Sequence, residues 1–106
     1  MKSLIITVVA LLSLAVTVQA QTTLQQADEA YARRAENFDR AAMTVDPANI
    51  DRAIELFTAS FGQSSGTERE EACWKLIRAC YFKGQYAVSG SDAKKAVYDV
   101  GKKTGE

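Results

Sequence analysis

A stretch of apolar residues, 72–82, most limits the folds open to this sequence. It predicts a helix that runs to Lys83 and ends at Gly84. Thr67 and Glu70 have the spacing of a capping box at its start. Because apolar side chains surround most of its circumference, the helix must be covered on more than one side. We therefore expect it to be the central helix of its domain. Its apolar members are Ala72, Cys73, Trp74, Leu76, Ile77, Ala79, Cys80, Tyr81 and Phe82.

Three further segments have helical periodicity, so the sequence predicts an all-α fold of four helices. Residues 23–43 carry an apolar face of Leu24, Ala27, Tyr31, Phe38 and Ala42. A second helix starts with Asp46 as N-cap and Pro47 as first helical residue. It carries Ile50, Ala53, Ile54, Phe57 and Phe61, and Gly62 ends it. The last helix follows Ser91 or Asp92, carries Ala93, Ala96, Val97 and Val100, and meets a tail at residues 101–105.

The first twenty residues have the form of a secretory signal peptide. Lys2 precedes an apolar run at residues 4–16, and Val18-Gln19-Ala20 is a small-x-small cleavage pattern. The run is shorter than the about 20 residues of a membrane-spanning helix. No cysteine stands directly after it at the cleavage site, so a lipid anchor has no acceptor residue. We expect residues 21–106 to be exported to the periplasm with no spanning segment after cleavage.

Composition lowers the expectation of nucleic-acid binding and of catalysis. Thirteen basic residues balance thirteen acidic ones, whereas nucleic-acid-binding domains usually carry a basic surplus. The chain has no histidine, which removes the commonest general base and metal ligand. No nucleophile motif is present. We expect no nucleic-acid partner, no enzymatic activity, no cofactor and no metal site.

The two cysteines are expected to be unpaired with each other. Cys73 and Cys80 lie seven residues apart, about 10.5 Å along a helix. A disulfide needs Cα atoms within about 7 Å. We interpret both as small buried apolar residues, and an intermolecular or redox-active thiol is the alternative.

Paired helices with small and aromatic residues resemble tetratricopeptide repeats. Trp74, Ile77, Tyr81, Gly84 and Tyr86 resemble the signature of a repeat's first helix. Ala53 and Phe57 are similar to the alanine and phenylalanine of a second helix, and Tyr31 is the matching aromatic of the first. Arg78 stands where repeats usually have glycine. The turn before Gly84 is one residue short, and the connection from Tyr31 to Ala53 is long.

Residues 78–86 and 95–102 carry a closer resemblance to the T component associated with TRAP transporters, an exported bacterial family with tetratricopeptide-like repeats. The resemblance implies a protein-interaction module and an accessory role in transport of small organic acids. It implies a substrate-binding transporter component as partner, and assembly into a homo-oligomer.

Each helical hairpin leaves an apolar face uncovered, and arrays usually need at least three repeats. We expect residues 21–106 to be a helical-repeat domain and the N-terminal fragment of a longer array. The alternative is a partner that covers the open end.

A second functional hypothesis is a periplasmic carrier with an apolar ligand in a helical pocket. Trp74, Tyr81, Phe82 and Tyr86 are its candidate lining, although aromatics at helical spacing are more often core residues. We expect Trp74, Ile77 and Tyr81 to form the seam between hairpins, with Lys75 facing away from it. Arg78 either reaches solvent or an acid such as Glu71, or faces a groove as the cation for an acidic ligand.

Overall fold

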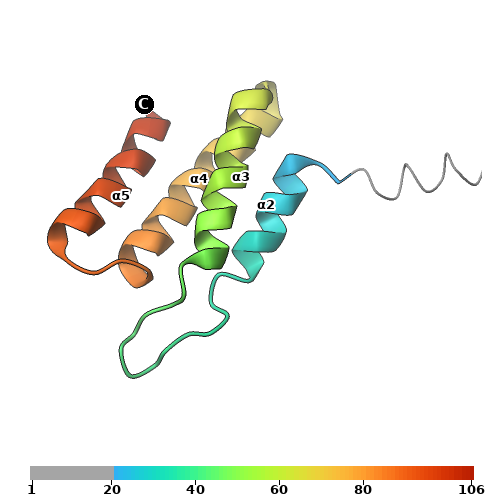
Figure 1. Cartoon of the computed structure of the whole chain (residues 1–106). Helices are drawn as coiled ribbons and strands as arrows, with labels where there is room; N and C mark the ends of the chain where they lie inside the picture. The colour runs from blue at the N-terminus through green and yellow to red at the C-terminus, as the bar shows by residue number, and fades with distance from the viewer. Residues whose placement is uncertain (1–20) are drawn as a thin grey trace, which may run out of the picture.

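Four helices follow one another in the computed structural model, which describes residues 21–106. They are α2 (Thr23–Ala32), α3 (Ala48–Gln63), α4 (Gly66–Tyr86) and α5 (Ser91–Gly105). Each helix lies beside the preceding one and is connected to it at alternating ends (Figure 1). The predicted all-α class and number of helices are confirmed over these residues. The predicted signal peptide, residues 1–20, lies outside the described residues.

The core lies between α2, α3 and α4. In α3, Ile50, Ala53 and Phe57 are fully buried, as their helical spacing predicts. Leu24 and Ala27 of α2 cover one side of this stripe. Small residues let α4 approach closely on the other side. The buried members from α4 are Ala72, Leu76, Ala79 and Cys80.

Helix α2 is half as long as the sequence predicts. A capping box opens it: the Thr22 side chain accepts from the Gln25 N–H, and the Gln25 side chain accepts from the Thr22 N–H. The helix ends at Ala32 rather than near Met43, so the predicted apolar positions Phe38 and Ala42 are exposed.

The connection after α2 has its own local hydrogen bonds, which explain the early end of the helix. Asp39 Oδ1 accepts from the N–H groups of Ala41 and Ala42. This arrangement gives the backbone an alternative to helical bonding. Asn37 and Met43 have positive φ angles. Figure 1 shows the connection extending beyond the helices.

Tertiary contacts fix the end of this connection against α4. Val45 is buried, and its N–H donates to the Tyr86 carbonyl at 3.0 Å. The Phe38 ring lies 6.3 Å from the Tyr86 ring. These contacts compete with a longer α2, and neither is visible in the local periodicity.

Several predicted helix boundaries are wrong by a few residues. Asp46 Oδ1 accepts from the Ala48 N–H, as expected of a capping residue, but α3 begins after Pro47. Gly62 lies inside α3, which ends at Gln63. Helix α4 begins at Gly66 without a side-chain cap, so the predicted Thr67–Glu70 capping box does not form. Gly62 does not end α3, because a single glycine inside a helix costs only about 1 kcal/mol.

Two glycines bring α4 and α5 together. A Cβ at Gly84 would meet the Tyr98 ring, with Cζ 2.8 Å away. A Cβ at Gly101 would lie 3.2 Å from the Cys80 Cβ. Gly84 lies within α4, and the predicted tail at residues 101–105 belongs to α5. The close approach of α4 and α5 thus requires Gly84 and Gly101, although the sequence pattern predicts a helix end at each of them.

No helix within residues 21–106 has the length and apolar content needed to cross a membrane.

Candidate functional site

The exposed face of α4 is not the one that the sequence predicts. Trp74 and Tyr81 are 50 % and 59 % exposed, so they do not form a seam between hairpins. Ile77 is partly buried. Lys75, expected to face away, is only 9 % exposed. Successive residues of a helix differ by about 100° in direction. A small error in the predicted buried face therefore reverses which of two adjacent residues is buried and which is exposed.

Lys75 is buried because two carboxylates surround it. Its Nζ lies 2.8 Å from Asp28 Oδ1 of α2 and 2.8 Å from Glu71 Oε1 of α4. Burial lowers the pKa of Lys75, but the hydrogen bonds and negative charges of Asp28 and Glu71 outweigh it and raise the pKa above its ordinary value. The amine is therefore charged, and the interaction connects α2 to α4.

Two arginines contact one tyrosine ring on the neighbouring surface. The Arg34 Cζ lies 4.1 Å from the centroid of the Tyr31 ring, and the Arg78 Cζ lies 3.9 Å from it. Arg78 also lies 5.0 Å from the Trp74 ring, and Arg34 lies 5.2 Å from the Phe82 ring. Such stacking favours a guanidinium group over the face of an aromatic ring.

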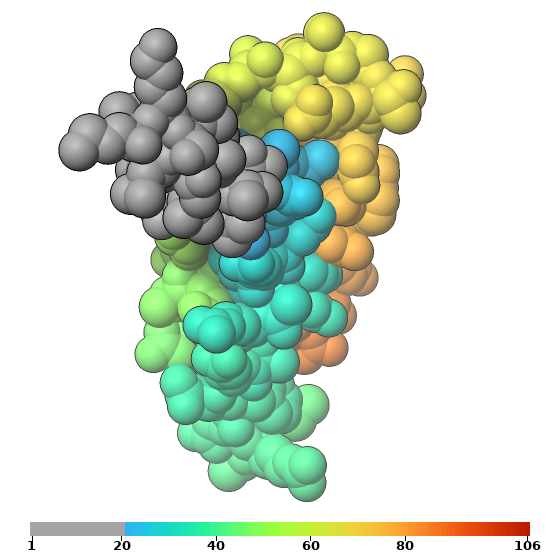
Figure 2. All heavy atoms as spheres, turned by 90° about the vertical axis from the view of Figure 1, so that its right-hand side faces the viewer, coloured from blue at the N-terminus to red at the C-terminus, as the bar shows by residue number. Residues whose placement is uncertain are grey.

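We call this region the aromatic–arginine surface, formed by Tyr31, Arg34, Trp74, Arg78, Tyr81 and Phe82. Tyr31 belongs to α2 and Arg34 lies two residues beyond its end, while α4 supplies the other members. In Figure 2, α2 lies beside α4, with the orange part of α4 to its right. Trp74, Arg78 and Tyr81 are exposed and spaced by four and three residues, so they form one stripe along α4.

Neither arginine of this surface forms an ion pair within residues 21–106. Arg34 Nη1 donates to the Tyr31 carbonyl at 3.0 Å, while its buried Nε has no hydrogen-bond partner in this part of the chain. Arg78 is exposed and does not pair with Glu71, the acid considered for it, because Glu71 is bound to Lys75. Aromatic rings, rather than acids, therefore hold both guanidinium groups in place.

The four aromatics expected to line a ligand pocket do not line one together. Phe82 and Tyr86 contact each other at 5.0 Å between ring centroids. Tyr81 instead lies 5.7 Å from Tyr98 of α5. Among the residues that resemble a repeat signature, Gly84, Ala53 and Phe57 are buried at helix contacts. Tyr86 is partly buried at the end of α4.

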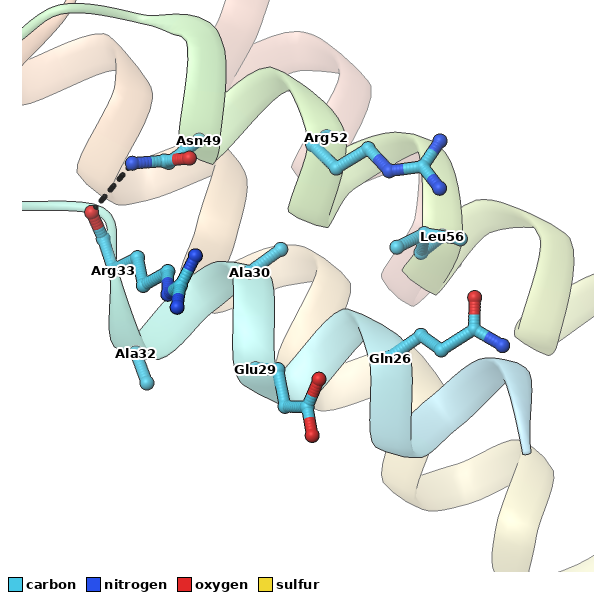
Figure 3. A pocket seen from close by; sticks show the side chains of 8 residues that line it. All are labelled: Gln26, Glu29, Ala30, Ala32, Arg33, Asn49, Arg52 and Leu56. Carbon is cyan, nitrogen blue, oxygen red and sulfur yellow. Dashed lines mark hydrogen bonds between the residues drawn. The ribbon is translucent and has the colours of Figure 1, made fainter. Parts of the chain in front are cut away.

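A polar groove of about 630 Å³ lies between α2 and α3. Figure 3 shows Ala30 and Leu56 in the gap between the two helices, with charged side chains around them. Asn49 Nδ2 donates to the Arg33 carbonyl at one end of the groove. The remaining lining residues are Gln26, Glu29, Ala32 and Arg52. The charged members of this lining are one acid, Glu29, and two bases, Arg33 and Arg52.

An apolar recess of about 360 Å³ lies between α4 and α5. Its lining consists of Ile77, Cys80, Tyr81, Tyr98, Gly101 and Lys102. Of the four predicted pocket aromatics, Tyr81 lines this recess.

Both cysteines are free, in agreement with their spacing. Cys80 is buried, and burial raises the pKa of its thiol. Cys73 is partly buried, with its Sγ 3.7 Å from the Thr104 carbonyl oxygen. Residues 21–106 contain no group of three metal-ligating side chains.

Sequence reasoning missed the roles of Tyr31, Arg34 and Lys75. The spacing Glu71–Lys75 is that of an i,i+4 ion pair, and Tyr31–Arg34 is i,i+3. Both spacings are visible in the sequence. Asp28, the second partner of Lys75, and Arg78, the second partner of Tyr31, come from other helices. No protein family, curated protein or solved structure matches this chain, so the resemblance to tetratricopeptide repeats stays a prediction.

Proposed function

We propose that this chain is an exported helical-repeat module that binds a partner protein through the aromatic–arginine surface. The observation that carries the proposal is the exposed stripe of Trp74, Arg78 and Tyr81 beside Tyr31. Each of these side chains is large and lies on a helix.

The chemistry of this stripe favours association with a protein. Tryptophan, tyrosine and arginine are the residue types that most often dominate binding energy at protein interfaces. Rings held on helices lose little conformational entropy when a partner covers them. Stacking on Tyr31 and Trp74 further restricts the Arg78 side chain before binding.

The resemblance to the T component suggests the identity of the partner. We propose that the partner is the substrate-binding component of a TRAP-type transporter for small organic acids. The module would then act in the periplasm as an accessory component of that transporter.

Site-specific photocrosslinking tests this function. A benzophenone amino acid replaces Tyr81, which is 59 % exposed, in the chain expressed in its own host. The control places the same group at Thr58, an exposed position on α3. We expect a protein adduct from position 81 that mass spectrometry identifies as the substrate-binding component, with none from position 58. The same adducts from both positions, or none from position 81, would contradict the proposal.

The recess between α4 and α5 favours a second function, a carrier for an apolar ligand. Its lining is predominantly apolar, and Tyr81 and Tyr98 form one wall. Native mass spectrometry of the purified chain distinguishes the two functions. A bound lipid or other apolar molecule that is lost in Gly101→Leu supports the carrier, whereas a protein adduct at position 81 supports the interaction module.

A further inference from the structure

We infer that the partner segment recognised at the aromatic–arginine surface is acidic: a helical segment with two carboxylates one turn apart, which Arg34 and Arg78 bind together. The inference rests on the proposed function and specifies the chemistry of its partner.

The two guanidinium groups are close enough to act on one segment. Both Cζ distances are measured to the centroid of the Tyr31 ring, so the Cζ atoms lie no farther apart than their sum, 8.0 Å. Side chains three or four residues apart on a helix have Cβ atoms about 5–6 Å apart. Two carboxylates on one helical turn can therefore reach both guanidinium groups at once.

The charge around the pair favours an acidic ligand. Asp28 and Glu71 are the carboxylates bound nearby on α2 and α4, and Lys75 Nζ occupies both at 2.8 Å. One lysine between two carboxylates leaves this cluster with a net charge of −1, and Arg34 and Arg78 bring the five side chains together to +1. Neither acid forms an ion pair with either arginine. An arriving carboxylate would form charge-assisted hydrogen bonds with guanidinium groups that have no acidic partner within the described residues.

The flanking rings favour a peptide over a free ion. Trp74 lies on one side of Arg78 along α4 and Tyr81 on the other, both about half exposed. Apolar side chains next to the two acids would cover these rings and desolvate the ion pairs. A small dicarboxylate could satisfy the arginines but would leave both rings in water.

Fluorescence titration with designed peptides tests the inference. Trp74 is the only tryptophan of the chain, and its ring lies 5.0 Å from the Arg78 Cζ, so its emission reports on the site. Two helical peptides without aromatic residues are compared on the full chain. They are identical except that one carries Glu at positions i and i+4 and the other carries Gln. We expect the Glu peptide to bind at least about tenfold more tightly, and this preference to weaken with added salt.

Arg78→Gln is the decisive variant, and Arg69→Gln is its matched control. Arg69 also stacks on an aromatic ring, with its Cζ 3.8 Å from the Phe61 centroid, but it lies outside the aromatic–arginine surface. We expect Arg78→Gln to abolish the preference for Glu and Arg69→Gln to retain it. Circular dichroism of both variants verifies that the helices are intact.

Three outcomes would overturn the acidic segment: equal binding of both peptides, an unchanged preference in Arg78→Gln, or full displacement by succinate at the peptide's own concentration. The last would assign the arginines to a free dicarboxylate. A protein cross-linked from position 81 together with equal binding of the peptides would retain the proposed function and reject the acidic segment. A preference for Glu without any cross-linked protein would retain the acidic site and reject the function.

Discussion

Lys75 of α4 and Asp28 of α2 form a bidentate contact, with Nζ 2.8 Å from Oδ1 and 3.0 Å from Oδ2. The two residues lie 47 positions apart in the chain. Glu71 approaches the same amine from one turn earlier on α4. This contact joins the first described helix to the third, which are separated in sequence by α3.

Replacing Lys75 with methionine should destabilise the chain by about 1–3 kcal/mol, because Asp28 and Glu71 would be left side by side without a cation. Both acids are partly exposed, which keeps the loss at the lower end of effects for buried pairs. Lys95→Met removes the exposed pair with Asp99 and should cost no more than about 0.5 kcal/mol. Urea unfolding of both variants gives the comparison. Equal losses would mean that the Lys75 cluster does not hold α2 on α4.

The contribution of Lys75 should disappear at alkaline pH. Its pKa is raised in the folded chain above the ordinary value of 10.5, so the folded state binds the proton more tightly. The stabilisation is complete below 10.5 and is lost as the pH rises from there through the raised pKa. The difference in unfolding free energy between the wild type and Lys75→Met, measured from pH 8 to pH 12, should therefore shrink above 10.5. A constant difference across this range would contradict the expected charge coupling.

Two glycine-to-alanine substitutions should act in opposite directions. Both Gly62 and Gly84 lie inside helices, where alanine is intrinsically favoured by about 1 kcal/mol. Nothing lies within 4 Å of a Cβ at Gly62, so Gly62→Ala should raise the melting temperature. Gly84→Ala should lower it, because its Cβ would collide with the Tyr98 ring. A rise for both variants would mean that α5 does not pack on α4 at Gly84.

Trp74→Ala should cost much less stability than Phe57→Ala. Phe57 is fully buried, and its loss should cost about 3–5 kcal/mol. Trp74 is half exposed, and we expect about 1–2 kcal/mol for its removal. Its fluorescence emission in the native chain should lie close to that of solvent-exposed tryptophan. Blue-shifted emission and a loss as large as that of Phe57→Ala would instead place Trp74 in a helix seam.

The two thiols should differ in reactivity. Cys80 is buried with a raised pKa, so a thiol reagent at pH 8 should modify it only when the chain opens. Cys73 is partly buried near the end of α5 and should react earlier. Mass spectrometry of partly modified Cys73→Ser and Cys80→Ser variants gives each rate. Comparable rates in the folded chain would contradict the burial of Cys80.

The sequence predicts the helices well where their partners are ordinary apolar residues, as in the stripe of Ile50, Ala53 and Phe57. The prediction fails where a residue that is distant in the chain determines the end of a helix or the burial of a side chain. Besides the local hydrogen bonds of Asp39, the bond from Val45 to Tyr86 competes with a longer α2, and no local pattern reveals that bond.

The candidate site was predicted in part. Arg78 stands out in the sequence because an arginine is unusual in a predominantly apolar helix, and its exposure agrees with a side chain that reaches solvent. Its stacking partner Tyr31 belongs to another helix, and apolar periodicity does not record stacking between helices. Local periodicity likewise does not reveal that Lys75 is buried and Trp74 is exposed. The ion pair with Asp28 of another helix is what makes a buried lysine favourable.

The order of the helices in space repeats their order in the chain, with extensive contacts from α2 to α3, α3 to α4 and α4 to α5. Each helix can therefore dock on a surface that has already been synthesised, and folding can advance from the N-terminal end as the chain emerges. Among the described helices, α5 has extensive contacts with α4 alone, whereas α3 has them with both α2 and α4, so fewer contacts oppose local opening of α5. Amide hydrogens of α5 should accordingly exchange with solvent faster than those of α3.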